Sequence, residues 1–181
     1  MPLMLDHIVI ATPNLAQATQ AFTDAGFTVR AGGTHANGAT HNALIGLADG
    51  TYLELLAHTG EQARPAPIDF SRMLAHATTG IVGYAWQCDD LDAEAARWRA
   101  KGAQVSAIVE GERVRTDGVR LQWRLALLED GFAPFFIQDV TPRAWRVPND
   151  VHRNGAQSYA DVLTLARFTP ALAPFFVVSV S

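Results

Sequence analysis

The chain has 181 residues, of which 49% are hydrophobic and 18% charged, and its formal net charge at pH 7 is −4. This length suits one ordinary domain or two half-sized modules that share a core. The negative charge argues against a nucleic-acid partner, and the absence of an apolar run of 18 residues argues against a membrane span. Cys88 is the single cysteine, which excludes an internal disulfide, and no signal peptide is recognisable, so we expect a cytoplasmic protein.

The first 60 residues predict a strand, a helix and three further strands. Residues 5–12 (LDHIVIAT) are a hydrophobic run typical of a buried strand, although the run contains a histidine. Asn14 suits the N-cap of the following helix, and Gly26 suits the left-handed residue that ends it. A short strand at 27–33 and a polar loop follow, and residues 41–57 divide at an Asp-Gly turn into two strands.

The second half, residues 80–142, repeats this order. Asp90 or Asp92 can cap its helix and Gly102 can end it, so cap and stop are 12 residues apart, as they are in the first half. Strands are predicted at 80–88 and 103–110, and two more on either side of an Asp130-Gly131 turn. The constant offset of 76 through strand and helix indicates an internal duplication.

Two segments lie outside the repeats. Residues 61–79 contain two prolines and predict a linker with a short helix near its end. In the extension at 143–181, residues 158–166 and 174–181 predict strands. The apolar end of the chain needs a cover, either from sheet pairing or from a second subunit, so a homodimer is one expectation.

The paired modules, with histidine in the first strand (LDHIVIATPNL) and glutamate in the fourth (DGTYLELLA), resemble the vicinal oxygen chelate superfamily. Within it the chain is similar to glyoxalase-like domain proteins, through GGTHANGATHNALIGLADGTYLELLA, RTDGVRLQWRLAL, PFFIQD and VPNDVHRNGAQSY. The resemblance implies an α+β fold of two fused βαβββ modules, of the glyoxalase, bleomycin-resistance and dioxygenase kind, with a short C-terminal extension. It also implies a ligand or metal between two cupped sheets.

Members of the superfamily commonly hold a divalent metal through the first and last strand of each module. The matching positions here are His7 and Glu54 in the first module and Gly83 and Gln138 in the second, and glycine has no side chain to offer. One interpretation is therefore a Zn, Mn, Ni or Fe ion bound by His7, Glu54 and Gln138. The other is a plain hydrogen bond from His7 or an arginine to a buried Glu54.

Further candidates surround the expected cup. His41, or less favourably His35, can complete a set of metal ligands if the loop before the third strand folds over the cup. Five further residues are candidates for ligand contacts, although each can instead serve in ordinary core packing or in a solvated hairpin. They are Asn42, Tyr52, Trp86, Arg115 and Trp123.

Two functions of different class follow. The first is a metal-assisted lyase, isomerase or dioxygenase in which Glu54 is a permanent ligand or a base that moves. The second is a metal-free protein that binds or sequesters a small organic molecule, with Arg115 and Trp123 among its contacts. The histidine missing from the second module favours the second function, and the retained pair of His7 and Glu54 favours the first.

Overall fold

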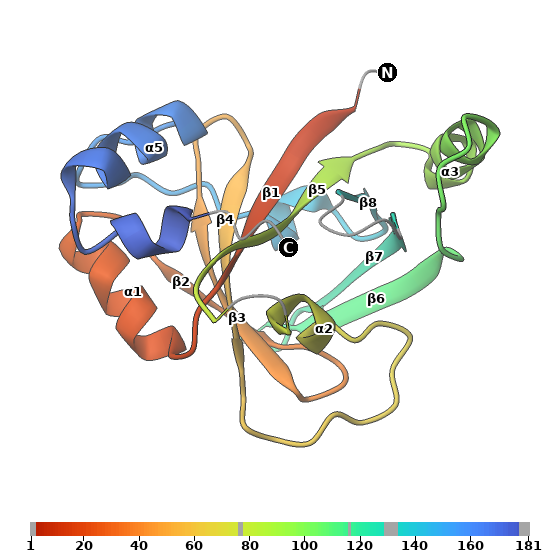
Figure 1. Cartoon of the computed structure of the whole chain (residues 1–181), viewed down its shortest axis with the longest axis horizontal. Coiled ribbons are helices and arrows are strands. Elements are labelled where there is room, and N and C mark those ends of the chain that lie inside the picture. Colours follow the sequence, from red (N-terminus) through yellow and green to blue (C-terminus); the bar gives the residue numbers. More distant parts are fainter. Residues whose placement is uncertain (1–2, 76–77, 116, 129–133, 178–181) are drawn as a thin grey trace.

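The structure is a computed structural model that describes residues 3–75, 78–115, 117–128 and 134–177. Its core is one eight-stranded sheet with the strand order β2-β3-β4-β1-β5-β8-β7-β6 (Figure 1). The strands are β1 (Met4–Ala11), β2 (Arg30–Thr34), β3 (Thr40–Gly46), β4 (Tyr52–His58), β5 (Gly80–Gln87), β6 (Val109–Val114), β7 (Arg120–Leu127) and β8 (Phe135–Asp139).

The strand order confirms the duplication. Each half is ordered second, third, fourth, first, and the two first strands, β1 and β5, pair antiparallel at the centre of the sheet. Within each half the first and last strands are parallel neighbours, β1 with β4 and β5 with β8. The fold is therefore α+β, as the resemblance implied.

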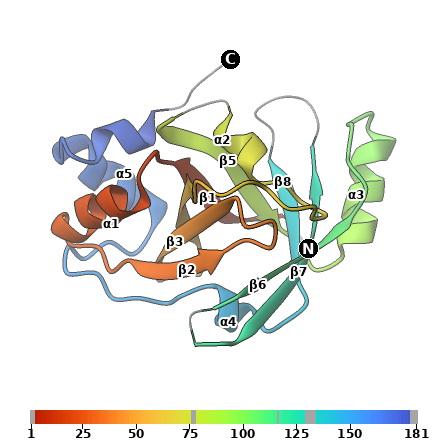
Figure 2. The ribbon, with the colours of Figure 1, turned by 90° about the horizontal axis from the view of Figure 1, so that it is seen from below.

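The main helices are α1 (Leu15–Asp24), α3 (Leu91–Ala100) and α5 (Tyr159–Phe168), with short helices α2 (Ser71–Leu74), α4 (Arg143–Arg146) and η1 (Ala173–Phe176). Helices α1 and α5 lie at one end of the molecule and α3 lies at the other (Figure 2). The predicted caps of α1 and α3 are confirmed: the side chains of Asn14 and Asp90 accept backbone hydrogen bonds there. Among the described residues, no helix combines the length and apolarity that a membrane crossing needs.

The predicted strands of the C-terminal extension are wrong. Residues 159–168 form α5, because Ser158 and Asp161 make a reciprocal capping box at its start and Val162 and Ala166 bury one helical face. Residues 173–176 form η1, whose Phe175 and Phe176 pack against the core; residues 178–181 lie outside the described part. Phe175 and Phe176 are thus partly buried within the chain itself, whereas Val177 is exposed.

Two predictions for the second half remain, of which one is wrong and the other concerns residues that the structure does not describe. Residues 103–108 are not a strand, and β6 begins only at Val109, because the segment before it bonds irregularly to the end of β7. The predicted turn at Asp130-Gly131 lies outside the described residues.

Candidate functional site

Strand alternation aims one face of the first half at the helices and the other at a pocket. On β1 and β4, Ile8, Ile10, Leu53 and Leu55 pack in the cluster that includes α1. The intervening residues of the same strands, which line the pocket, are His7, Val9, Tyr52, Glu54 and Leu56. The register of the parallel pair places His7 opposite Tyr52 and Val9 opposite Glu54, which brings the imidazole and the carboxylate together.

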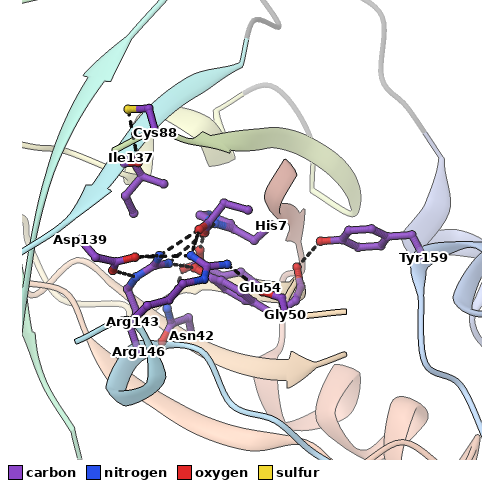
Figure 3. Close-up of polar contacts among 12 residues, drawn as sticks. His7, Asn42, Gly50, Glu54, Cys88, Ile137, Asp139, Arg143, Arg146 and Tyr159 are labelled. Carbon is purple, nitrogen blue, oxygen red and sulfur yellow. Dashed lines mark hydrogen bonds and ion pairs between the residues drawn. The ribbon is translucent and has the colours of Figure 1, made fainter. Parts of the chain in front are cut away.

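Asp6, His7 and Glu54 form a chain of buried polar contacts, of which Figure 3 labels His7 and Glu54. Nδ1 of His7 lies 2.6 Å from Oδ1 of Asp6, and Nε2 lies 3.3 Å from Oε2 of Glu54. The pairing of β1 with β5 shifts register between Leu5 and His7. Such a bulge re-aims side chains, which explains how the neighbouring Asp6 also reaches the histidine. The imidazole therefore has one carboxylate on each side.

These contacts decide the charges of the pair. Burial favours neutral imidazole, but the hydrogen bonds and charges of Asp6 and Glu54 outweigh it and raise the pKa of His7. Burial likewise opposes ionisation of Glu54, but the contacts with His7, the charge of His35 and the hydrogen bond from Asn42 lower the pKa of Glu54 to about 2. The two groups form an imidazolium–carboxylate pair below the pKa of His7.

Asn42 binds the other oxygen of Glu54, and His35 lies near it. Nδ2 of Asn42 donates to Oε1 at 2.6 Å, and Nε2 of His35 lies 3.6 Å from the same oxygen. Nδ1 of His35 lies 2.9 Å from the hydroxyl of Thr40, which orients the ring. Burial lowers the pKa of His35, so this second imidazole is neutral at pH 7.

Arg113 reaches the pocket from β6, in the second half. Its side chain is buried and donates to the carbonyl oxygen of Gly32. No carboxylate lies within ion-pair distance of Arg113 among the described residues, and burial lowers the pKa of its guanidinium. A Cβ atom at position 32 would come within 2.7 Å of Nη1 of Arg113 and 2.0 Å of Oδ1 of Asn42, so glycine lets the ends of these two side chains lie against β2. That amide oxygen is buried without a described hydrogen-bond partner.

The C-terminal extension contributes a second buried arginine, Arg146 of α4. Its guanidinium bonds the carboxylate of Asp6 at 2.9 Å and that of Asp139 at 2.6 and 2.9 Å. It also donates to the hydroxyl of Tyr52 at 2.8 Å, and Tyr52 stacks on the His7 ring with centroids 4.5 Å apart. Arg143 adds a further ion pair to Asp6 (Figure 3). The extension therefore fixes β1, β4 and β8 around the histidine.

Below the pKa of His7, the charges in and around the pocket do not balance. Three carboxylates face three guanidinium groups and, below the pKa of His7, one imidazolium. One positive charge is then in excess, in surroundings where an unpaired charge is costly. The groups are Asp6, Glu54, Asp139, Arg113, Arg143, Arg146 and His7.

The space at the site has two parts. An inner cavity of about 30 Å³ lies against His7, Glu54 and Arg113, and this volume holds about two water molecules. An outer groove of about 380 Å³ shares His35, Phe70 and Trp123 with the inner cavity and continues along the linker and β6. The inner cavity accommodates a head group, and the outer groove has the volume of a small-molecule site.

Several predicted site residues lie at this pocket. Asn42, Tyr52 and Trp123 line it together with His7 and Glu54. His41 does not line it; the less favoured His35 occupies that place. Sequence reasoning missed Asp6, Arg113 and Arg146. Arg113 has a sequence signal, because alternation put it near the chosen Arg115, whereas no local pattern marks Arg146.

Three predicted residues point elsewhere, and these placements are corrections. The amide of Gln138 bonds Asp89 and Leu91 at the start of α3 and Arg124 of β7, on the far face of the sheet. Trp86 packs in the cluster under α3. Arg115 is partly exposed, pairs with Asp117 and donates to the carbonyl of Trp145 at 2.9 Å.

The second half does not supply the metal ligands that the superfamily pattern requires. Val9 pairs with Glu54, and the equivalent Ala85 pairs with Phe135, so Phe135 rather than Gln138 occupies the position of Glu54. The Phe135 ring lies 5.4 Å from the His7 ring, between centroids, and the Met73 methyl fills the space beside Gly83. No group of three His, Cys, Asp or Glu side chains suited to an ion occurs among the described residues. The second half therefore offers no ligand at either position, and these residues do not fit an ion held in the manner of the superfamily.

Comparison with known proteins agrees with this fold. A model of the family described as glyoxalase-like domain matches residues 5–175. A hypothetical protein from Staphylococcus aureus superposes with a TM-score of 0.68 at 19% identity, over 80% of this chain and 62% of that protein. Thus the chain spans less than two thirds of that protein.

Two epimerase structures are also similar. A variant of methylmalonyl-CoA epimerase from Streptomyces coelicolor, in complex with 2-nitronate-propionyl-CoA, has a TM-score of 0.58 and 25% identity, covering 77% of this chain and all of that one (100%). The Mycobacterium tuberculosis enzyme has a TM-score of 0.58 and 20% identity, covering 78% and 90%. No curated protein has a significant sequence match to the chain. The strand order, the duplicated modules and the match over residues 5–175 show that the chain belongs to the glyoxalase-like domain family of the vicinal oxygen chelate superfamily.

Proposed function

We propose that the protein binds a small organic anion, with its carboxylate or enolate in the inner cavity and its body in the outer groove. The observation that carries this proposal is the buried guanidinium of Arg113, which lines the cavity without a carboxylate partner among the described residues. A guanidinium matches a carboxylate in geometry and charge, and such charge-assisted hydrogen bonds are the strong ones. The ligand would neutralise the excess positive charge of the pocket.

The remaining walls suit the same class of ligand. Opposite the polar group formed by His7, Glu54 and Arg113, the cavity is lined by apolar side chains of the second half and α2: Met73, Leu125, Phe135 and Ile137. A polar head with a carbon skeleton satisfies both sides of such a pocket. This proposal corresponds to the metal-free function, and nothing in it passes through a metal ion.

A binding experiment tests Arg113 directly. Arg113→Gln is expected to weaken the binding of propionate, followed by chemical-shift titration of the ¹⁵N-labelled protein, by about tenfold to a hundredfold. Arg120→Gln is the matched control, because Arg120 lies on the adjoining strand β7, carries the same charge and is exposed in a pair with Glu112. Equal propionate affinity in the wild type and the folded Arg113→Gln variant would refute the proposal.

A second candidate function is proton transfer, and the observation that favours it is the chain of contacts from Asp6 through His7 to Glu54. A bound anion beside Glu54 raises the pKa of both neighbours, since like charge disfavours a carboxylate and opposite charge favours an imidazolium. Glu54 would then remove a proton from the substrate carbon and return a proton to the same carbon, while His7, whose ring Asp6 orients, holds the Glu54 carboxylate in place. The reaction class is proton exchange next to a carbonyl or carboxylate.

Exchange of carbon-bound protons in D₂O tests this second function. The wild type is expected to accelerate the exchange of the C3 protons, which lie next to the oxo group, in a panel of 2-oxo acids, and His7→Gln or Glu54→Gln to slow it about a hundredfold. Proton NMR measures the rates. Wild-type rates equal to those of buffer would eliminate proton transfer and leave anion binding intact.

A further inference from the structure

The outer groove restricts the body of the ligand, an inference that rests on the proposed anion site. The groove adjoins the inner cavity at His35, Phe70 and Trp123, which line both, so a ligand with its head at Arg113 and its body in the groove would pass these rings. Phe70 packs on His35 with ring centroids 4.5 Å apart. Trp123 is buried beside Gly111, where any side chain would come within 2.3 Å of its indole nitrogen. The indole ring of Trp123 therefore lies against Gly111 and forms one flat wall of the groove.

The opposite wall is apolar and comes from the linker. Pro65, Pro67 and Ile68 line the groove from the segment between β4 and α2. Aromatic walls favour a flat or hydrocarbon body, because rings pack in stacked or edge-to-face contacts and burial of apolar surface adds to the affinity. A volume of about 380 Å³ accommodates a ring with a short chain.

The charged residues of the groove are acidic. Glu110 and Glu112 of β6 line it, and none of the described lining residues is lysine or arginine. Glu112 is paired with Arg120 at 3.1 Å, whereas Glu110 has no ion pair among the described residues. A nucleotide with several phosphates would meet an uncompensated carboxylate here, and like charge at close range disfavours binding.

We infer that the ligand is a carboxylic acid with an apolar, ring-bearing body and no phosphate, which lies between Trp123, Phe70 and the linker prolines. The chain would then differ in ligand from the structurally similar epimerases, one of which was solved with 2-nitronate-propionyl-CoA. The fold is shared, but the groove beside the pocket is built for a different molecule.

Three probes separate this inference from the proposed function: propionate, 4-phenylbutyrate and propionyl-CoA. With the wild-type chain, 4-phenylbutyrate is expected to bind about tenfold more tightly than propionate, and propionyl-CoA more weakly than 4-phenylbutyrate. Trp123→Leu and Phe70→Ala should weaken the binding of 4-phenylbutyrate much more than that of propionate and so remove most of the advantage of the phenyl group. Trp98→Phe is the control, since Trp98 packs on Phe136 under α3, away from the groove.

Changing the charge of Glu110 tests the exclusion of phosphates independently. Glu110→Lys is expected to raise the affinity for propionyl-CoA several-fold at low salt, and more than the affinity for propionate, with Glu110→Gln intermediate. Equal binding of propionate and 4-phenylbutyrate, or tighter binding of propionyl-CoA than of either acid, would overturn the inference while Arg113-dependent binding keeps the proposed function. Loss of Arg113 dependence for both acids would overturn the proposed function and the inference with it.

Discussion

Replacing Arg146 with methionine is expected to lower the free energy of unfolding by about 3–5 kcal/mol, the cost of removing one partner from a buried ion pair. Asp6 would keep its pair with Arg143, but the bonds of Arg146 to Asp6, Asp139 and Tyr52 would be lost together. Methionine retains much of the volume, so the change reports the charge and the hydrogen bonds more than a cavity. Urea unfolding followed by circular dichroism measures it.

The matched control is Arg120→Met, which breaks the exposed pair with Glu112. Exposed pairs contribute little, so a loss below about 1 kcal/mol is expected there. A loss of the same small size for Arg146→Met would mean that the ion pairs of α4 do not hold the site together. The comparison also tests whether the extension is part of the folded core, because Arg146 joins it to both halves of the sheet.

The sequence carries enough information for the fold because its signals agree at several levels. Asn14 and Asp90 are good N-caps, Gly26 and Gly102 adopt the positive φ that their positions require, and the offset between the halves is constant through the first helix. The meeting of His7 and Glu54 follows from alternation on two strands that the fold places side by side. For these residues, the local sequence pattern and the tertiary structure favour the same conformation.

The parts of the site that the sequence did not predict depend on strand register and on contacts distant in the sequence. Counting residues to Gln138 assumed that extra residues before β8 keep the alternation, but the pairing of Ala85 with Phe135 gives Gln138 the opposite face. Asp6 reaches His7 through a bulge, which no sequence pattern reveals. Arg146 comes from a segment beyond the repeats, so only the tertiary fold brings it to Asp6.

The pH dependence of stability tests the charge state assigned to the pair of His7 and Glu54. The pKa of Glu54 is lowered from its ordinary 4.5 to about 2, so its contribution is complete above pH 4.5 and is lost as the pH falls towards 2. This shift corresponds to about 3 kcal/mol, of which about 2 kcal/mol is lost by pH 3. The pKa of His7 is raised, so its contribution is complete below pH 6.5 and is lost as the pH rises through the folded-state pKa.

The free energy of unfolding is therefore expected to be highest between about pH 4.5 and 6.5 and to decrease on both sides. Glu54→Gln should reduce the decrease between pH 5.5 and 3 by about 2 kcal/mol, and also the decrease on the alkaline side, because His7 loses one of its two acidic partners. Urea unfolding at pH 3, 5.5 and 8 measures both limbs, with exposed Glu61→Gln as the control. Parallel pH curves for the wild type and Glu54→Gln would mean that the carboxylate and the imidazole do not share a proton-dependent interaction, and Glu54 could then not act with His7 in the pocket.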